Sequence, residues 1–259
     1  MIELKSVHKG FGDLIVLDGV DFAVQRGETV ALMGPSGTGK SVLLKHINGL
    51  IHPDAGEVWV DGTNVSLLKR RTLAKLRSRV GYVFQYGALF DSMSVAENIQ
   101  LGITDEVAAA DRAFGEHRVI ECLGLVNLPA EVAGKYPAEL SGGMKKRVGI
   151  ARAIAGQPTY LLYDEPTSGL DPVNADIIDS LVIKLRNELG VTSVVVTHDV
   201  RSAFQIANRL ALLQNGRIIE EGTQEQLLAS ENEAVQRFLG RDLEITLAQL
   251  QRYRHGPTL

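Results

Sequence analysis

The stretch TVALMGPSGTGKS, residues 29–41, decides the fold of this chain. Its first five residues, Thr29–Met33, form a mostly apolar run of the length of a buried strand. The next eight, GPSGTGKS at 34–41, match the pattern G-x-x-x-x-G-K-[ST], and a helical pattern over Lys40–Ile47 follows. Because a loop of this kind between a strand and a helix binds nucleotide phosphates, the stretch predicts a nucleoside-triphosphate site.

Each fixed position of this loop has a chemical task. Gly37 and Gly39 allow backbone N–H groups to turn inward around phosphate oxygens, and the helix N-terminus adds positive potential. Lys40 is expected to reach the β- and γ-phosphates, and Ser41 to ligate Mg²⁺. The alternative, a glycine-rich turn into a helix, is disfavoured because every fixed position matches. The predicted nucleotide contacts are Gly34, Pro35, Ser36, Gly37, Thr38, Gly39, Lys40 and Ser41.

Apolar runs alternate with helical patterns outward from this loop. Short, nearly continuous apolar runs are typical of parallel strands that helices cover on both faces. The alternation therefore predicts an α/β fold with a mainly parallel sheet. The predicted core strands are Thr29–Met33, Arg79–Phe84, Tyr160–Tyr163, Ser193–Thr197 and Arg209–Leu213. The predicted helices are Lys40–Ile47, Met144–Ile154, Pro172–Asn187 and Val200–Ala207.

Two regions depart from this alternation. Residues 91–150 contain helical stretches at Val95–Leu101 and Val107–Leu123 without a convincing strand, which indicates a helical insert. Near the N-terminus, three short runs are predicted as strands, of which the first two belong to an edge sheet. They are Ile2–Val7, Val20–Val24 and Glu57–Val60.

The composition is that of a globular protein. Of 259 residues, 45% are hydrophobic and 22% are charged, which excludes a disordered or fibrous chain. The net charge of −4 disfavours a strongly basic nucleic-acid binder, and the single cysteine, Cys122, fits a reducing compartment. No stretch approaches the roughly 18 apolar residues of a membrane span, and no signal-peptide pattern opens the chain. We expect a cytoplasmic protein that reaches a membrane only through a partner.

Two acidic residues follow the predicted strand Tyr160–Tyr163. Asp164 stands at the strand end, where a carboxylate beside a phosphate loop organises Mg²⁺. Glu165 is next to it, in a position to polarise the attacking water as a general base. Acidic residues are common at strand ends, so the pair is informative only together with the phosphate loop.

A second anion-binding pattern, LSGGM at 140–144, precedes the helical stretch KKRVGIARAI. Ser141, Gly142 and Gly143 present a hydroxyl and flexible backbone at a helix N-terminus, which favours phosphate. An ordinary serine N-cap is the simpler alternative. Two phosphate-binding elements in one chain suggest that the LSGG of one subunit closes on the triphosphate held by the other.

Together these motifs resemble the nucleotide-binding domain of ATP-binding-cassette (ABC) transporters over roughly residues 1–225. The landmarks, in family order, are Phe11, the phosphate loop, Gln85, LSGGM, the Asp164–Glu165 pair, SGLD at 168–171 and His198. The resemblance implies a P-loop NTPase (RecA-like) core with an antiparallel edge β-subdomain and an inserted helical subdomain. It implies one ABC ATPase domain at 1–240, with its core at 1–90 and 151–240 and its helical subdomain at 91–150. A tail at 241–259 follows.

The resemblance also implies ligands and roles. ATP and Mg²⁺ would bind in two composite sites of a homodimer. Phe11 would stack on adenine, unless it only covers the core. Gln85 would contact Mg²⁺ together with Ser41 and Asp164, and His198 would hydrogen-bond the γ-phosphate; Glu165, His198 and Gln85 form the implied catalytic set. Asp171 would cross the dimer interface, and it joins Ser141, Gly142 and Gly143 as an implied nucleotide contact.

Two details suggest a subfamily. Met144 replaces the usual Gln of the signature, and YGALFDSMSVAENI follows Gln85. GALF together with LSGGM resembles the ATPases of Mce/Mla-type phospholipid transporters. That implies phospholipid movement between inner and outer membranes through an integral-membrane permease, from the cytoplasmic face of the inner membrane. A periplasmic Mce-domain protein and a small STAS-type accessory protein would be further partners.

Other functions share part of this pattern. An ATPase of an importer for polar solutes, such as amino acids, has nearly every motif above. A soluble ABC ATPase of DNA repair would interrupt the cassette with coiled coils or zinc modules, which this sequence lacks. A small-molecule kinase would have no use for LSGG. We therefore expect a transport motor without a nucleic-acid partner.

Overall fold

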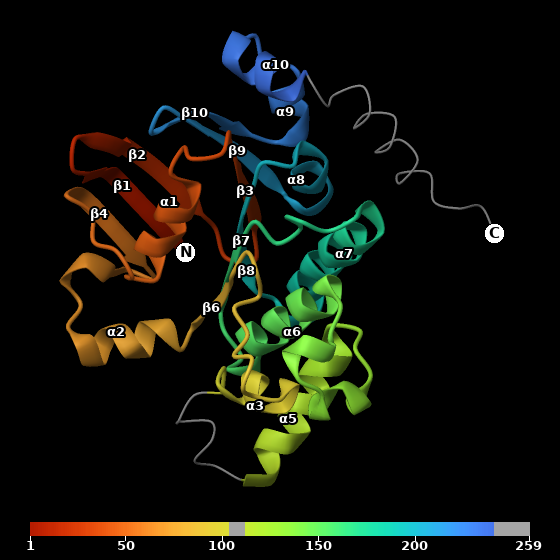
Figure 1. Ribbon diagram of the computed structural model, residues 1–259. Coiled ribbons are helices and arrows are strands. Elements are labelled where there is room, and N and C mark those ends of the chain that lie inside the picture. The colour runs from red at the N-terminus through yellow and green to blue at the C-terminus, as the bar shows by residue number, and fades with distance from the viewer. Residues whose placement is uncertain (104–111, 241–259) are drawn as a thin grey trace.

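The computed structural model describes residues 1–103 and 112–240. Its centre is a six-stranded sheet with the strand order β10-β9-β3-β8-β7-β6, in which only β10 runs antiparallel to its neighbour (Figure 1). The predicted α/β fold with a mainly parallel sheet is confirmed. The strands are β3 (Thr29–Met33), β6 (Val80–Val83), β7 (Tyr160–Asp164), β8 (Thr192–Thr197), β9 (Arg209–Gln214) and β10 (Arg217–Gly222).

Strand β3 shows why the core strands are continuously apolar. Val30 and Leu32 join the apolar cluster on one face of the sheet, whereas Ala31 and Met33 join the cluster on the other face. All five residues of the strand are buried. Because neither face meets water, no polar residue interrupts the run.

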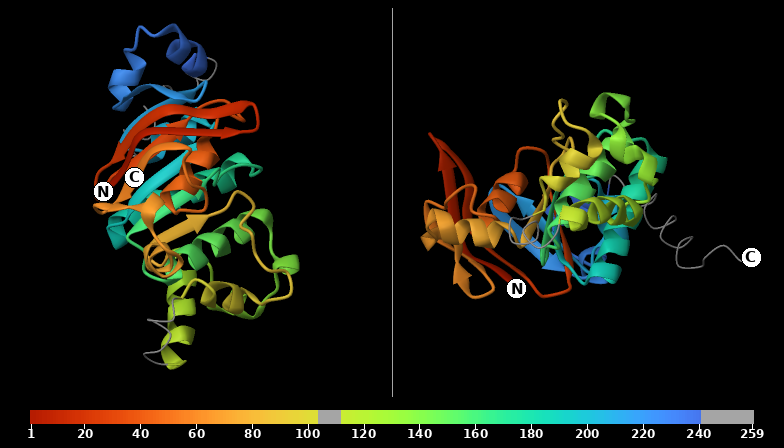
Figure 2. Two further views of the ribbon diagram at one scale, coloured as in Figure 1. Left: turned by 90° about the vertical axis from the view of Figure 1, so that its left-hand side faces the viewer. Right: turned by 90° about the horizontal axis from the view of Figure 1, so that it is seen from below.

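A second, antiparallel sheet has the order β2-β1-β4-β5. It comprises β1 (Ile2–Phe11), β2 (Leu14–Val24), β4 (Ala55–Val60) and β5 (Thr63–Asn64). Its apolar side chains share one cluster with those of α1 (Lys40–Ile47) and one face of the central sheet. The two sheets lie side by side (Figure 2). This is the predicted edge sheet, although β1 and β2 extend beyond their predicted bounds to Phe11 and back to Leu14, where most of the added residues are only partly buried.

Helices cover the other face of the central sheet: α6 (Gly142–Ala155), α7 (Pro172–Leu189) and α8 (Val200–Ile206). The helices α3 (Val95–Gln100) and α5 (Arg112–Leu125) pack against α6. The predicted boundary at residue 150 falls inside α6. Residues 107–111 of the predicted helix Val107–Leu123, and the tail at 241–259, lie outside the described residues.

Several short elements were not predicted. Residues Asn215 and Gly216 have φ angles of 50° and 75°, as a two-residue hairpin turn requires, and this Asn-Gly pair joins β9 to β10. The turn signal was therefore present in the sequence. The remaining helices are α2 (Arg70–Arg77), α9 (Gln224–Leu228) and α10 (Glu233–Leu239), with 3₁₀ turns at Val65–Leu67, Ala130–Gly134 and Pro137–Glu139.

Within 1–103 and 112–240, we find no helix with the length and apolarity needed to cross a membrane.

Candidate functional site

The candidate site lies where three neighbouring parallel strands end. β3 runs into the phosphate loop, β7 ends at Asp164, and β8 is followed by His198. Since β8 pairs with both β3 and β7, their carboxyl ends meet at one edge of the sheet. A pocket of about 390 Å³ opens there, lined by Phe11, Val16, Ser36, Gly37, Gly39, Lys40, Ser41, Val42, Gln85, Glu165 and His198.

The phosphate loop is tightly held by its surroundings. A Cβ at Gly34 would lie 2.2 Å from the carbonyl oxygen of Leu213, so no larger residue fits without a shift. Lys40 is buried, and its Nζ donates to the carbonyl oxygens of Gly34 at 2.7 Å and Pro35 at 2.9 Å. Burial lowers the pKa of Lys40, while the negative charges of Glu165 and Asp164 oppose that shift. The loop thus holds an ammonium group at the pocket wall, where a triphosphate chain would compensate it.

Oxygen ligands suited to Mg²⁺ stand beside this lysine. The hydroxyl of Ser41 donates to Oδ1 of Asp164 at 2.6 Å, and the hydroxyl of Tyr82 donates to Oδ2 at 3.0 Å. Burial and the neighbouring Asp164 raise the pKa of Tyr82, so its proton stays on the donor. Hydroxyl and carboxylate oxygens are the donors that Mg²⁺ prefers. The residues present therefore fit a magnesium ion, which Ser41 and Asp164 would hold.

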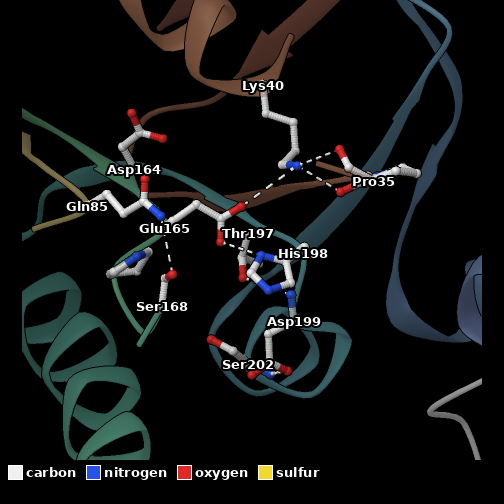
Figure 3. A network of polar contacts seen from close by, with 12 residues as sticks. Pro35, Lys40, Gln85, Asp164, Glu165, Ser168, Thr197, His198, Asp199 and Ser202 are labelled. Carbon is white, nitrogen blue, oxygen red and sulfur yellow. Dashed lines mark hydrogen bonds and ion pairs between the residues drawn. The ribbon is translucent and has the colours of Figure 1, made fainter. Parts of the chain in front are cut away.

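Glu165 is the centre of a polar network (Figure 3). Its Oε1 lies 3.7 Å from Nζ of Lys40, and its Oε2 lies 2.8 Å from Nδ1 of His198. Its backbone has a φ angle of 49°, a left-handed conformation that is strained for a residue with a side chain. Such strain persists where the surrounding structure imposes it, and it is common at functional sites.

Gln85 and Phe11 complete the pocket from outside the central strands. Gln85 follows β6 by two positions, and its Nε2 donates to Oγ of Ser168 at 3.2 Å. Phe11, at the end of β1, is 49% exposed, with Nζ of Lys9 5.4 Å from its ring centroid. An exposed aromatic ring at the rim of the pocket fits the predicted stacking on adenine, which remains a prediction.

The LSGGM signature and Asp171 do not line this pocket. The hydroxyl of Ser141 accepts from the backbone N–H of Met144 and caps α6, as the simpler alternative expected. Asp171 caps α7 in the same way, by accepting from the N–H of Asn174. Contacts of Ser141, Gly142, Gly143 and Asp171 with a nucleotide would therefore need a second subunit, and they remain predictions.

Besides Val42, which follows the phosphate loop on α1, two residues of the site were missed in the sequence. Val16 lines the pocket from β2, in a segment that we did not predict as a strand. Tyr82 donates a hydrogen bond to Asp164 from β6, which was predicted as a strand. Aromatic residues are common in strands, so the sequence does not indicate this contact. No motif marks either position.

Comparison with known proteins decides the family. Residues 17–168, more than half of the chain, match the family "ABC transporter". The chain belongs to the ABC transporter family. It is 36% identical to a dimeric ATP-binding cassette solved in a post-hydrolysis state with ADP and Pi, with a TM-score of 0.78 over 86% of this chain and 98% of that one. The fold of this cassette is therefore that of the P-loop NTPases, and its site residues fit ATP and Mg²⁺ as ligands.

Two relatives of the cassette carry different transport names. One is the methionine import ATP-binding protein MetN of Carboxydothermus hydrogenoformans, 43% identical over 85% of this chain and 64% of that protein. The other is the intermembrane phospholipid transport system ATP-binding protein MlaF of Haemophilus influenzae, 38% identical over 92% of this chain and 90% of that protein. The cassette spans less than two thirds of the length of the MetN relative.

Proposed function

We propose that the cassette is the ATP-hydrolysing subunit of a membrane transporter. The observation that supports this most directly is the convergence of Lys40, Glu165 and His198 on one pocket beside the Ser41–Asp164 pair. In this proposal Lys40 and the loop hold the phosphates, and Ser41, Asp164 and Gln85 hold Mg²⁺. Glu165 accepts a proton from the attacking water, and His198 and Gln85 orient the reacting groups.

We further propose that two copies of the cassette form two composite sites. Ser141, Gly142 and Gly143 would close on the phosphates held by the partner subunit, and Asp171 would contact the partner next to α7. The helix start at Ser141 supports this proposal, because its exposed N-terminus favours an anion. The ATPase domain that forms these sites would comprise residues 1–240, with the helical subdomain at 91–150 inserted into the core.

The surface next to Gln85 suits a permease helix. A hollow of about 280 Å³ is lined by residues that include Tyr82, Leu101 and Arg152. Arg152 donates to the carbonyl oxygens of Gly87 and Ala88, which fixes the loop after Gln85 against this hollow. Four large apolar side chains lie exposed on this part of the chain: Phe84, Tyr86, Phe90 and Leu101. Exposed apolar groups of this size favour a protein partner.

For the cargo, we propose phospholipid that moves between the inner and outer membranes. The MlaF relative supports this, since the alignment covers nine tenths of both chains. The motifs GALF at 87–90 and LSGGM at 140–144 support it as well. The cassette would then sit at the cytoplasmic face of the inner membrane, bound to the permease, with an Mce-domain protein and a STAS-type protein as further partners. The second candidate is amino-acid import, which the higher identity to MetN favours.

Reconstitution separates the two cargoes. The cassette is co-purified with the permease encoded beside it and placed in liposomes with fluorescent phospholipid or with labelled methionine and glutamate. We expect ATP-dependent movement of phospholipid that is lost with Glu165→Gln in the cassette. ATP-dependent uptake of an amino acid, without phospholipid movement, would overturn the lipid proposal in favour of the importer.

A further inference from the structure

Lys146 is a buried cation outside the nucleotide pocket. It lies in the second turn of α6 and is only 6% exposed. Its Nζ lies 2.7 Å from the carbonyl oxygen of Ser168, 2.8 Å from that of Pro166 and 3.4 Å from that of Glu165. One ammonium group thus connects α6 to three carbonyls in the turn after β7.

The geometry of this contact is complete for a lysine. An ammonium group has three N–H donors, and three carbonyl oxygens surround this one. Burial lowers the pKa of Lys146 to about 8, and the charge of Glu165 opposes the shift. A buried charge is tolerated only when it is well hydrogen-bonded, so the turn and the lysine hold each other in place.

The turn that Lys146 holds is the one that presents the general base. Glu165 has its strained backbone at the start of this turn, and the N–H of Ser168 donates to the Glu165 carbonyl at 3.2 Å. Ser168 also accepts the hydrogen bond from Gln85. A shift of the turn would therefore move Glu165 and the partner of Gln85 together.

We propose that Lys146 is a positioning residue that fixes the Glu165 turn to α6, so that the placement of the general base depends on the helix that begins at Ser141. The inference rests on the proposed function, since it deepens the role of Glu165. Lys146 does not line the nucleotide pocket, and it acts only through the backbone of residues 165–168.

The first test replaces the lysine in the full-length chain. Lys146→Met keeps most of the volume and removes the three donors, Lys146→Gln keeps two donors, and Lys145→Met is the matched control on the same helix. We expect Lys146→Met to lower kcat about 10- to 100-fold, as a displaced catalytic group does, with an unchanged Kd for ATP. Lys146→Gln should recover a large part of kcat. A wild-type kcat in Lys146→Met would overturn the inference.

Mixed dimers distinguish positioning from general destabilisation. When one chain carries Glu165→Gln, only the Glu165 of the other chain hydrolyses ATP. Lys146→Met on the chain with the intact Glu165 should lower activity at least 10-fold more than Lys146→Met on the Glu165→Gln chain. Equal losses in the two arrangements would overturn the inference.

Amide hydrogen exchange tests the contact without ATP hydrolysis. In Lys146→Met we expect faster exchange at the amides of Glu165, Thr167 and Ser168, and no change in Lys145→Met. Unchanged exchange at these amides would overturn the inference even if the chain hydrolyses ATP. If exchange is faster in Lys146→Met but the wild-type chain does not hydrolyse ATP, the contact between Lys146 and the turn is supported. The proposed function is then contradicted instead.

Discussion

Nδ1 of His198 lies 2.8 Å from Oε2 of Glu165, and the two residues directly follow the adjacent strands β8 and β7 of the central sheet. The other carboxylate oxygen of Glu165 lies 3.7 Å from Nζ of Lys40, the first residue of α1 (Figure 3). The proposed general base is therefore held between a phosphate-loop cation and an imidazole. A base that is already oriented needs less rearrangement when substrate binds.

Removing the base should separate binding from turnover. Glu165→Gln keeps the shape of the side chain, but it replaces one acceptor oxygen with an NH₂ donor and cannot accept a proton at neutral pH. We expect kcat to fall about 10²- to 10⁴-fold, the usual contribution of a positioned general base, with ATP affinity kept. Steady-state ATPase assays and ATP titration measure both quantities. Glu231→Gln, an exposed site far along the chain, is the control, and near-normal turnover in Glu165→Gln would remove Glu165 from this role.

Lys40→Ala should weaken nucleotide binding itself. The ammonium group would contact phosphates in the ground state, and a hydrogen bond to a charged group contributes roughly 1.5–3 kcal/mol. We expect the Kd for ATP to rise about 10- to 100-fold in calorimetry. Lys45→Ala, on the last turn of the same helix α1, should bind ATP like the wild type. An unchanged ATP affinity in Lys40→Ala would contradict the proposed phosphate contact.

Mixed dimers test the composite sites. If each site combines the Lys40 of one chain with the Ser141 of the other, then Lys40→Ala and Ser141→Arg on one chain damage both sites. The same two changes on different chains fall in one site and leave the other intact. We expect nucleotide occupancy to be clearly higher when the changes are split, as measured by retained labelled ATP. Equal occupancy in the two arrangements would exclude the sandwich.

The sequence predicted the catalytic edge of the sheet more completely than its surroundings. β3 and α1 match their predicted bounds, because an uninterrupted apolar run and a phosphate-loop motif define both ends. The β10 strand was missed, although the Asn-Gly turn before it was visible. Its residues are only partly buried, so they lack the apolar pattern of a core strand.

Contacts between segments that are far apart in the chain could not be predicted from the sequence. Lys146 lies on the buried face of α6 with Gly143 and Ile150, and a charge on an apolar face could have been noticed. Its three carbonyl partners could not have been predicted, because every residue type has the same backbone carbonyl group. The same holds for Tyr82, whose partner Asp164 lies 82 positions away.

Asp179 predicts a pH dependence of stability. It is buried on α7 and accepts a 2.6 Å hydrogen bond from Oγ of Ser202 on α8. Burial raises its pKa to about 7, with Asp199 and Asp176 adding to the shift and the Ser202 hydrogen bond and Arg201 opposing it. The folded state therefore keeps a proton that the unfolded state releases above about pH 4. The free energy of unfolding then falls as pH rises from about 4 to 7.

Asp179→Asn should remove this dependence, because the amide does not titrate. Relative to the wild type, the variant should gain up to about 4 kcal/mol in unfolding free energy between pH 4 and pH 8. Urea unfolding at pH 4, 6 and 8 measures it. Glu188→Gln, which changes an exposed carboxylate on the same helix, is the control. Parallel pH profiles for Asp179→Asn and the wild type would show that Asp179 is not the titrating group.

Phe90→Asp should uncouple the cassette from its proposed permease. Phe90 is 54% exposed five residues after Gln85, and its backbone N–H donates to the side chain of the buried Asn98 at 2.8 Å. The side chain is thus free to contact a partner while the backbone stays fixed. An unpaired carboxylate buried in an apolar interface costs several kcal/mol, so we expect co-purification with the permease and cargo transport to fall sharply.

The same substitution should leave the isolated chain folded, because the Phe90 ring already faces solvent and the nucleotide pocket lies elsewhere. ATP affinity and the thermal midpoint of the isolated chain are therefore expected to stay near their wild-type values. Ile15→Asp, which adds a carboxylate at a 69% exposed position on β2, controls for surface charge and should co-purify normally. Wild-type yield of the Phe90→Asp complex would contradict the docking surface, whereas loss of folding would assign Phe90 to core packing.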